Sequence, residues 1–228
     1  MDKYSLLTDA YFGTGLFENG AGLRQHPRED PANYKDRQGL AYYLNYTGPI
    51  VNAAVDPIFK NDIKRDYNGS TLFQTFLDDC DRTGTDYQDF CKSAALQAKL
   101  YGVAYIVVDN SDELAERRSD AVAGRKLPFL KIVTPAQIKN WAIDRYGRLT
   151  MFQYTETSQV GANAKNTETY TWTQDLWAIG NGDGKATGNH NIGCVPVVQW
   201  LARNTDRKII KPPSEYLSVA PVSYTHLT

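Results

Sequence analysis

The hydrophobic and polar positions of this chain divide it into a helical first half and a strand-rich second half. The clearest helical pattern has apolar residues at steps of three and four, which places them on one face. Thr85 and Gln88 have the spacing of a capping box, and Gly102 is the expected stop. Val103–Val108 follows as a short apolar run, which predicts a buried strand. The residues of the shared helical face are Tyr87, Phe90, Cys91, Ala94, Ala98 and Tyr101.

Three further helices are expected before this one. The run from Asp36 to Tyr46 has helical character, and another helix begins at residues 47–49, with Pro49 acceptable in its first turn. Pro57 is expected to kink or split that helix at the preceding residue, because its ring clashes with the turn before it. A short helix is expected near residues 72–79.

Beyond a charged and polar loop at residues 110–127, the pattern is that of strands. Phe129–Val133 predicts a strand, and Thr134–Pro135 opens one helical turn. The order of helices followed by a mostly antiparallel meander predicts an α+β fold. The remaining expected elements are a hairpin of 141–144 with 148–156, strands at 168–173 and 176–179, a Gly-rich turn at 180–188, and an edge strand at 195–201 that carries Pro196.

Composition divides the chain into four parts. Residues 1–35 are rich in Gly, Asn, Asp and Pro, and predict a flexible N-terminal arm. Residues 36–213 carry the α+β domain, and residues 214–221 begin a helix. Residues 222–228 contain VSYTHL, which resembles the translation of a transposon-adapter end used in sequencing libraries. They are therefore expected to be an artefact, with the natural chain continuing past residue 221.

The overall composition is that of a globular protein, with 42% hydrophobic and 22% charged positions among 228 residues. A formal net charge of -1 excludes the usual polybasic class of nucleic-acid binder. No apolar run approaches the ~18 residues of a membrane span, and the N-terminus lacks the apolar core of a signal peptide. A cytosolic chain is therefore expected.

Metal and disulfide patterns are weak. Cys80, Cys91 and Cys194 lack the spacing of a zinc site or a disulfide framework, and Cys91 is expected to be a buried free thiol. The acidic run Asp79–Thr85 mimics the start of a calcium loop. Its twelfth position is Phe90 where that loop needs a bidentate glutamate, which favours a polar turn at the helix entry.

Catalytic patterns are also weak. The Gly-rich segments 13–22 and 180–188 do not fit the spacing of a phosphate loop. The histidines, His26, His190 and His226, lie outside metalloprotease or deaminase patterns, and no nucleophile-elbow motif is present. A Ser-His-Asp site built from distant residues stays open. No catalytic, cofactor-binding or metal-binding residue is therefore assigned.

Basic residues and tryptophans could each bind a nucleic acid, and each group also has a simpler structural interpretation. Basic residues near the C-terminus could contact phosphates or belong to a solvated loop: Arg203, Arg207, Lys208 and Lys211. A second basic group is interspersed with acidic residues, which weakens a DNA-binding interpretation: Arg117, Arg118, Arg125 and Lys126. The tryptophans could stack bases, but core or subunit-interface packing is favoured: Trp141, Trp172, Trp177 and Trp200.

Three segments carry a resemblance to a known family. They are LQAKLYGVAYIVVD at 96–109, PFLKIVTPAQIKNW at 128–141 followed by a D-x-x-G hairpin, and GCVPVV at 193–198. Together they resemble the N-terminal wing region of the portal proteins of tailed bacteriophages, over roughly residues 36–220.

This resemblance implies an architectural role. Portal proteins form a ring, typically of twelve copies, at one capsid vertex. Double-stranded DNA passes through it without sequence specificity during packaging and ejection, and the ring connects head and tail. The resemblance implies partners that are further copies of the chain, the terminase large subunit, scaffold and capsid proteins, and head-tail adaptors. It implies no enzyme activity, no cofactor and no membrane, and a location in the virion after assembly in the host cytoplasm. The family's stem helices, clip and tunnel loop would follow residue 221.

A head-to-tail ring needs two different complementary faces on each subunit. The aromatic-rich sheet and the kinked helix around Pro57 are expected to contribute to them. The alternatives are an unrelated small enzyme, a nucleic-acid-binding α+β domain, or another phage head-tail structural protein. Perturbed titrating groups in a deep cleft would favour an enzyme. Exposed apolar patches on two opposite faces would favour the ring.

Overall fold

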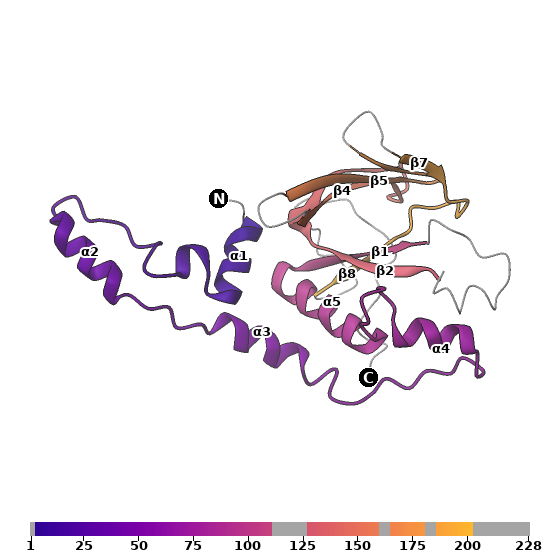
Figure 1. The fold of residues 1–228 in the computed structure, drawn as a ribbon, viewed down its shortest axis with the longest axis horizontal. Helices are drawn as coiled ribbons and strands as arrows, with labels where there is room; N and C mark the ends of the chain where they lie inside the picture. The colour runs from indigo at the N-terminus through magenta and orange to yellow at the C-terminus, as the bar shows by residue number, and fades with distance from the viewer. Residues whose placement is uncertain (1–2, 111–126, 160–164, 181–185, 203–228) are drawn as a thin grey trace.

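Two antiparallel sheets and a helical layer are stacked on one another in the computed structural model, which describes residues 3–110, 127–159, 165–180 and 186–202 (Figure 1). Most of the loop expected at 110–127 lies outside the described residues, as do the basic residues 203–211, the helix from Ser214 and residues 222–228.

The middle layer is a three-stranded sheet with β1 (Val103–Asp109) at its centre. Strands β2 (Phe129–Val133) and β8 (Val197–Leu201) pair with β1 on either side, both antiparallel. Alternate residues of β1 face opposite layers: Tyr105 packs toward the five-stranded sheet and Ile106 toward the helices. The prediction of a buried β1 is confirmed. The strand expected at 195–201 is β8 at the edge of this sheet, but it begins at Val197, after Pro196.

The outer layer is a five-stranded meander, in the order β3-β4-β5-β6-β7. Its inner face buries Phe152, Tyr154 and Trp172 against the middle sheet. Together with the preceding helices it confirms the α+β fold. The strands are β3 (Ile138–Ile143), β4 (Leu149–Gln159), β5 (Lys165–Thr173), β6 (Leu176–Ile179) and β7 (Ala186–Asn189).

The helical layer is built on α5 (Tyr87–Tyr101), which lies against the face of the middle sheet away from the meander (Figure 1). Its buried face contains small side chains, including Ala94, Ala95 and Ala98, which let the helix approach the sheet closely. Gly102 ends the helix in the left-handed conformation, with φ of 89°, as the sequence predicts. Helices α3 (Thr47–Val55) and α4 (Thr71–Asp78) contact α5.

The capping box expected at Thr85 and Gln88 is wrong. The N-cap of α5 is Asp86, whose side chain accepts a hydrogen bond of 2.9 Å from the Asp89 backbone N–H. Gln88 instead holds the preceding loop, because its Oε1 accepts from the Ile63 N–H at 2.8 Å. An aspartate next to the first helical residue caps at least as well as threonine, so the helix begins one residue later.

Several expected boundaries also shift. The helix expected at 36–46 is α2 (Pro31–Leu40), which starts earlier because Asp30 caps it and Pro31 opens its first turn. The residues that follow it, 41–46, are not helical. Pro57 was expected to kink or split its helix, but α3 ends at Val55 and no helix resumes until Thr71. The expected Gly-rich turn contributes residues 186–188 to β7, and its residues 181–185 lie outside the described part. The short helical turn expected after Thr134 is η2 (Pro135–Gln137).

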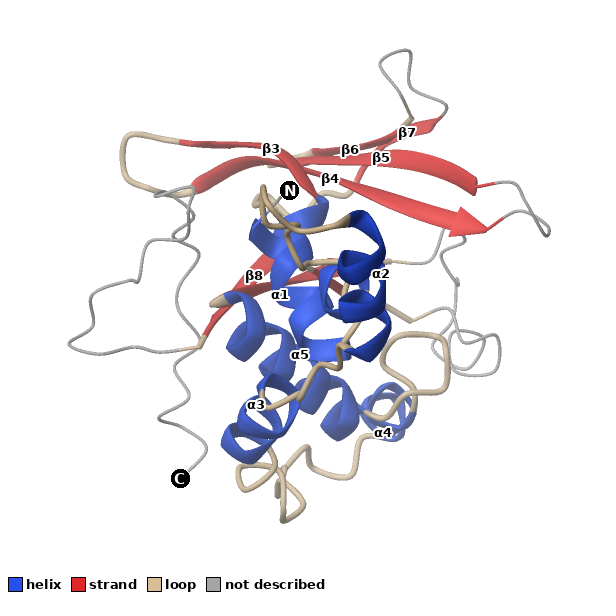
Figure 2. Ribbon diagram, turned by 90° about the vertical axis from the view of Figure 1, so that its left-hand side faces the viewer, coloured by secondary structure: helices blue, strands red, loops and turns tan. Residues whose placement is uncertain are grey.

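The arm, residues 1–35, contains more helix than its composition predicts. It includes α1 (Lys3–Phe12) and the short η1 (Gly15–Phe17). Helix α1 is attached to the body, since Thr8 and Tyr101 share a hydrogen bond of 2.7 Å and the Tyr11 hydroxyl donates to Asn52 at 2.9 Å. The later part of the arm and α2 extend away from the two sheets (Figure 1), so that α2 lies in front of the helical layer when the molecule is viewed from that end (Figure 2).

Candidate functional site

An exposed apolar segment runs from the last residue of α2 toward α3 and consists of residues 40–46. Residues 41–46 belong to no helix or strand, and exposed side chains alternate with half-buried ones along the segment. The exposed side is large and apolar: Leu40 is 82% exposed, Tyr42 81%, Leu44 58% and Tyr46 67%. Four such side chains in a row form a patch of the kind that marks a protein interface.

The other side of the apolar segment is fixed to the arm. The Tyr43 hydroxyl donates to the Ala10 carbonyl at 2.9 Å, and its ring lies 4.6 Å from that of Phe17. The Asn45 amide donates to the Tyr11 carbonyl at 2.7 Å, while its oxygen accepts from the Gly48 N–H at 3.0 Å. The segment is therefore held in place with its apolar side chains facing outward, which reduces the entropy cost of binding through them.

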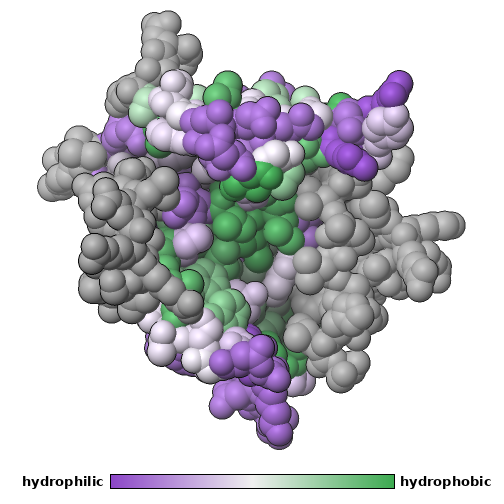
Figure 3. Space-filling view, turned by 90° about the vertical axis from the view of Figure 1, so that its right-hand side faces the viewer, coloured by the Kyte–Doolittle hydropathy of each residue, from purple (hydrophilic) through white to green (hydrophobic). Residues whose placement is uncertain are grey.

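An aromatic cavity lies at the opposite end of the molecule, between the end of β1 and strands β5 to β7. Its volume is about 520 Å³. Figure 3 views this end and shows a hydrophobic hollow between polar rims. The residues used below line it: Asp109, Tyr170, Trp172, Trp177, Ile179 and His190.

Strand register explains why the aromatic side chains meet. Trp172 lies directly opposite Trp177 across β5 and β6, and Tyr170 lies opposite Ile179, so all four project from the same face of the sheet. Trp177 in turn lies over Gly188 of β7, where a Cβ atom would come within 2.7 Å of the indole. Glycine is therefore required for this ring position.

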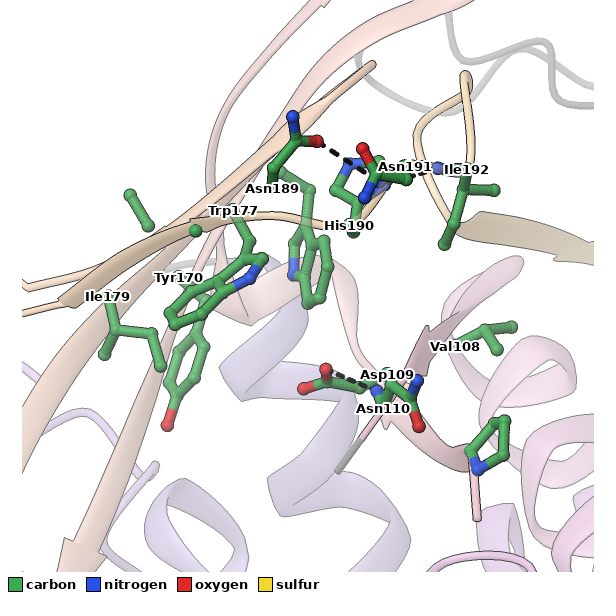
Figure 4. Close-up of a pocket in the computed structure, with 14 residues that line it drawn as sticks. Val108, Asp109, Asn110, Tyr170, Trp177, Ile179, Asn189, His190, Asn191 and Ile192 are labelled. Carbon is green, nitrogen blue, oxygen red and sulfur yellow. Dashed lines mark hydrogen bonds between the residues drawn. The ribbon is translucent and has the colours of Figure 1, made fainter. Parts of the chain in front are cut away.

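The polar residues of the cavity come from two separate segments. Asp109 ends β1 and faces the aromatic wall from below in the close-up (Figure 4). The His190 ring lies 5.8 Å from that of Trp172, and its Nε2 lies 3.0 Å from the Thr173 carbonyl. The cavity thus combines a broad aromatic wall with a carboxylate and an imidazole at its edge.

Carboxylates lie near Tyr170. Burial, then the carboxylates of Glu156 and Glu168 and to a smaller extent that of Asp109, together raise the pKa of its hydroxyl to about 12. The Lys131 ammonium lies beside this ring, with its Nζ 5.1 Å from the centroid. That ammonium also forms an ion pair with Glu156. A cationic group entering the cavity would be favoured by this field.

The acidic run Asp79–Thr85 is a closed turn. The Asp79 carboxylate accepts from the Gly84 N–H at 2.9 Å, and that of Asp81 accepts from the Thr83 N–H at 2.8 Å. Phe90 is buried. These carboxylates stabilise the entry to α5, which agrees with the polar-turn interpretation. Within the described ranges, no group of three His, Cys, Asp or Glu residues has the geometry to hold a metal ion.

The other singled-out residues take structural positions. Cys80 and Cys91 are buried free thiols, as expected for Cys91, and Cys194 is exposed. Trp141 packs on the core between the sheets, and Trp200 packs on the α5 side of the middle sheet. His26 lies in the arm, where its Nδ1 accepts from the Arg28 N–H at 3.2 Å. Among the helices of the described part, none is long and apolar enough to cross a membrane.

Sequence reasoning expected the aromatic-rich sheet to contribute to an interaction face, but it did not identify the apolar segment or the cavity. Residues 41–46 were expected to be helical, although Tyr42, Leu44 and Tyr46 recur with a period of two, which does not fit a helix. The meeting of Asp109 with Trp177 has no local signal, because strand order and register bring them together.

No protein-family model matches this chain, and no curated protein matches it either.

Proposed function

We propose that this chain is a structural subunit of a tailed-bacteriophage portal ring, the capsid-vertex channel for DNA packaging and ejection that connects head and tail. The observation that carries the proposal is the pair of unlike apolar surfaces at opposite ends of the molecule. One is the projecting apolar segment and the other is the hollow aromatic cavity.

A projection at one end and a hollow at the other are the requirements of a head-to-tail interface. Such an interface uses two different patches on each copy and closes into a ring when the rotation between neighbours is suitable. A two-fold dimer would instead need one self-complementary patch. The arrangement therefore supports a ring more directly than a simple dimer.

The resemblance supplies the biological setting of the proposal. Under this proposal the chain has no enzyme activity. Its partners are neighbouring copies, the terminase large subunit, scaffold and capsid proteins, and head-tail adaptors. Double-stranded DNA passes through the channel. The near-neutral charge of -1 suits a wall along which DNA slides without being held.

The proposal is tested by the mass of the assembled species. Native mass spectrometry over a wide range of concentrations is expected to give an oligomer of ring size for the wild-type chain. Replacing two exposed tyrosines together, Tyr42→Ser with Tyr46→Ser, is expected to give a monomer with an unchanged circular dichroism spectrum. The control Tyr146→Ser removes an exposed aromatic side chain outside both surfaces and should still assemble. A wild-type chain that stays monomeric at every concentration contradicts the proposal.

A further inference from the structure

The aromatic cavity has the chemistry of a site for a planar cation. Its wall presents Trp177, whose ring face attracts cations within ~6 Å of the centroid. The neighbouring Tyr170 ring already stacks on Tyr154 and has the Lys131 Nζ 5.1 Å from its centroid. Across from this wall lies the Asp109 carboxylate (Figure 4). Of the two cationic side chains, arginine suits such a site better, because a guanidinium stacks on aromatic rings and pairs with a carboxylate at its edge.

The surrounding charge agrees with a cationic occupant. Glu156 and Glu168 lie near the Tyr170 ring together with Asp109, and Lys131 is already paired with Glu156. Apolar side chains at the cavity edge, Ile179 and Ile192, could contact the hydrocarbon stem of an arginine.

The chain itself carries suitable arginines at its other end. Arg24 and Arg28 lie in the arm, are exposed, and make no side-chain hydrogen bond or ion pair with a described residue. In contrast, Arg37 pairs with Glu29, and Arg65 lies over the Tyr87 ring. The arm therefore offers free guanidinium groups beside the apolar segment.

We propose that the aromatic cavity binds an arginine side chain from the arm of a second copy of this chain, Arg24 or Arg28. This inference rests on the proposed head-to-tail assembly and adds charge recognition to its apolar contact. In the assembled ring the apolar segment would supply most of the buried area, and the arginine would fix how neighbouring copies are positioned relative to one another.

The test uses a synthetic peptide of residues 21–31 with blocked ends, and a twin with citrulline at both arginine positions. Citrulline has nearly the same shape as arginine without the charge. The peptides are titrated into the full chain carrying Tyr42→Ser and Tyr46→Ser, and binding is followed by calorimetry and tryptophan fluorescence. The arginine peptide is expected to bind saturably, and its twin at least about tenfold more weakly.

Variants of the cavity locate the binding. Asp109→Asn and Trp177→Leu are each expected to weaken the arginine peptide by about tenfold or more, whereas Tyr146→Ser, outside the cavity lining, should leave it unchanged. If Trp177→Leu does not fold, Asp109→Asn decides alone, because Asp109 ends a strand at the surface. Equal binding of both peptides, or insensitivity to Asp109→Asn, overturns the inference.

The two proposals fail separately. A wild-type chain that assembles while the peptide does not bind overturns the arginine site and leaves the ring. A monomeric wild-type chain that still binds the arginine peptide overturns the ring and leaves the selectivity of the cavity.

Discussion

Burial changes the chemistry of several single residues in this chain. It raises the pKa of the Cys80 thiol to about 12, with the Asp81 carboxylate adding to the effect, and it also raises the pKa of Cys91. Cys194 is exposed. Since the thiolate is the reactive form, the three cysteines should differ sharply in reactivity.

Cys194 is therefore expected to be the fast-reacting thiol of the folded chain. An aromatic disulfide reagent near neutral pH should modify it quickly and reach Cys80 and Cys91 only after unfolding. The release of the coloured thiolate gives the rates, and peptide mass spectrometry assigns them. Cys194→Ser should remove the fast phase. Modification of Cys91 in the folded chain at the rate of Cys194 would show that the α5 face is open.

Buried tyrosines make the fold sensitive to alkaline pH. Burial raises the pKa of Tyr87 and Tyr170 to about 12 and that of Tyr154 still higher, whereas an unfolded tyrosine ionises near pH ~10. Because the folded pKa lies above the unfolded one, the contribution to stability is complete below pH ~10 and is lost as pH rises toward the folded pKa.

Tyr154→Phe tests this dependence. The Tyr154 hydroxyl faces Trp172 Nε1, but neither atom reaches hydrogen-bond geometry with a described residue, so its removal should change stability little at neutral pH. The variant should lose less stability than the wild type between about pH 8 and pH 11, measured by the urea midpoint. An identical loss in both chains would mean that Tyr154 ionises freely in the fold.

At the scale of elements, local patterns predicted most of the strands and missed contacts between distant segments. Strand β2 has the bounds that the apolar run at 129–133 predicted, and the hairpin turns where the D-x-x-G pattern placed it. The N-cap of α5 was misplaced, because Gln88 has a tertiary partner in Ile63 that no local pattern reveals. Residues 41–46 are not helical and are held by hydrogen bonds from Tyr43 and Asn45 to the arm, which sequence spacing alone does not show.

Two variants at the start of α5 separate the structural cap from the predicted one. Asp86→Ala removes the side chain that accepts from Asp89 N–H and is expected to cost about 1 kcal/mol of unfolding free energy. Thr85→Ala should cost clearly less, since its side chain does not cap the helix. Chemical denaturation measures both. A larger loss of unfolding free energy for Thr85→Ala than for Asp86→Ala would instead support the capping box predicted at Thr85 and Gln88.

Gly102 and Gly39 form a matched pair. An added Cβ has no neighbour within 4 Å at either position, but Gly102 has φ of 89° whereas Gly39 lies inside α2. Gly102→Ala should destabilise the chain by about 1 kcal/mol, measured by the urea midpoint. Gly39→Ala should stabilise α2 by about 0.5–1 kcal/mol, measured by amide hydrogen exchange. Equal effects of the same sign would show that backbone conformation is not the cause.

At the scale of the whole molecule, the two ends differ in shape and in charge. The arm end exposes apolar and cationic side chains, and the other end has a hollow that Figure 3 shows as hydrophobic, lined by aromatic residues and Asp109. The prediction that a ring subunit presents two complementary faces stays a prediction. The aromatic sheet contributes to the hollow through Tyr170 and Trp177, while the part expected of the segment around Pro57 stays a prediction.

The central claim is that the arm of one copy meets the cavity end of the next. The most direct measurement places the photo-cross-linking residue benzoylphenylalanine at Tyr42 and identifies its partners by mass spectrometry, with the same residue at Phe73 as a control. The account predicts links between copies from position 42 to the cavity edge around Ile179 and Ile192. Links only to position 42 or the arm of another copy, or none between copies, would contradict it.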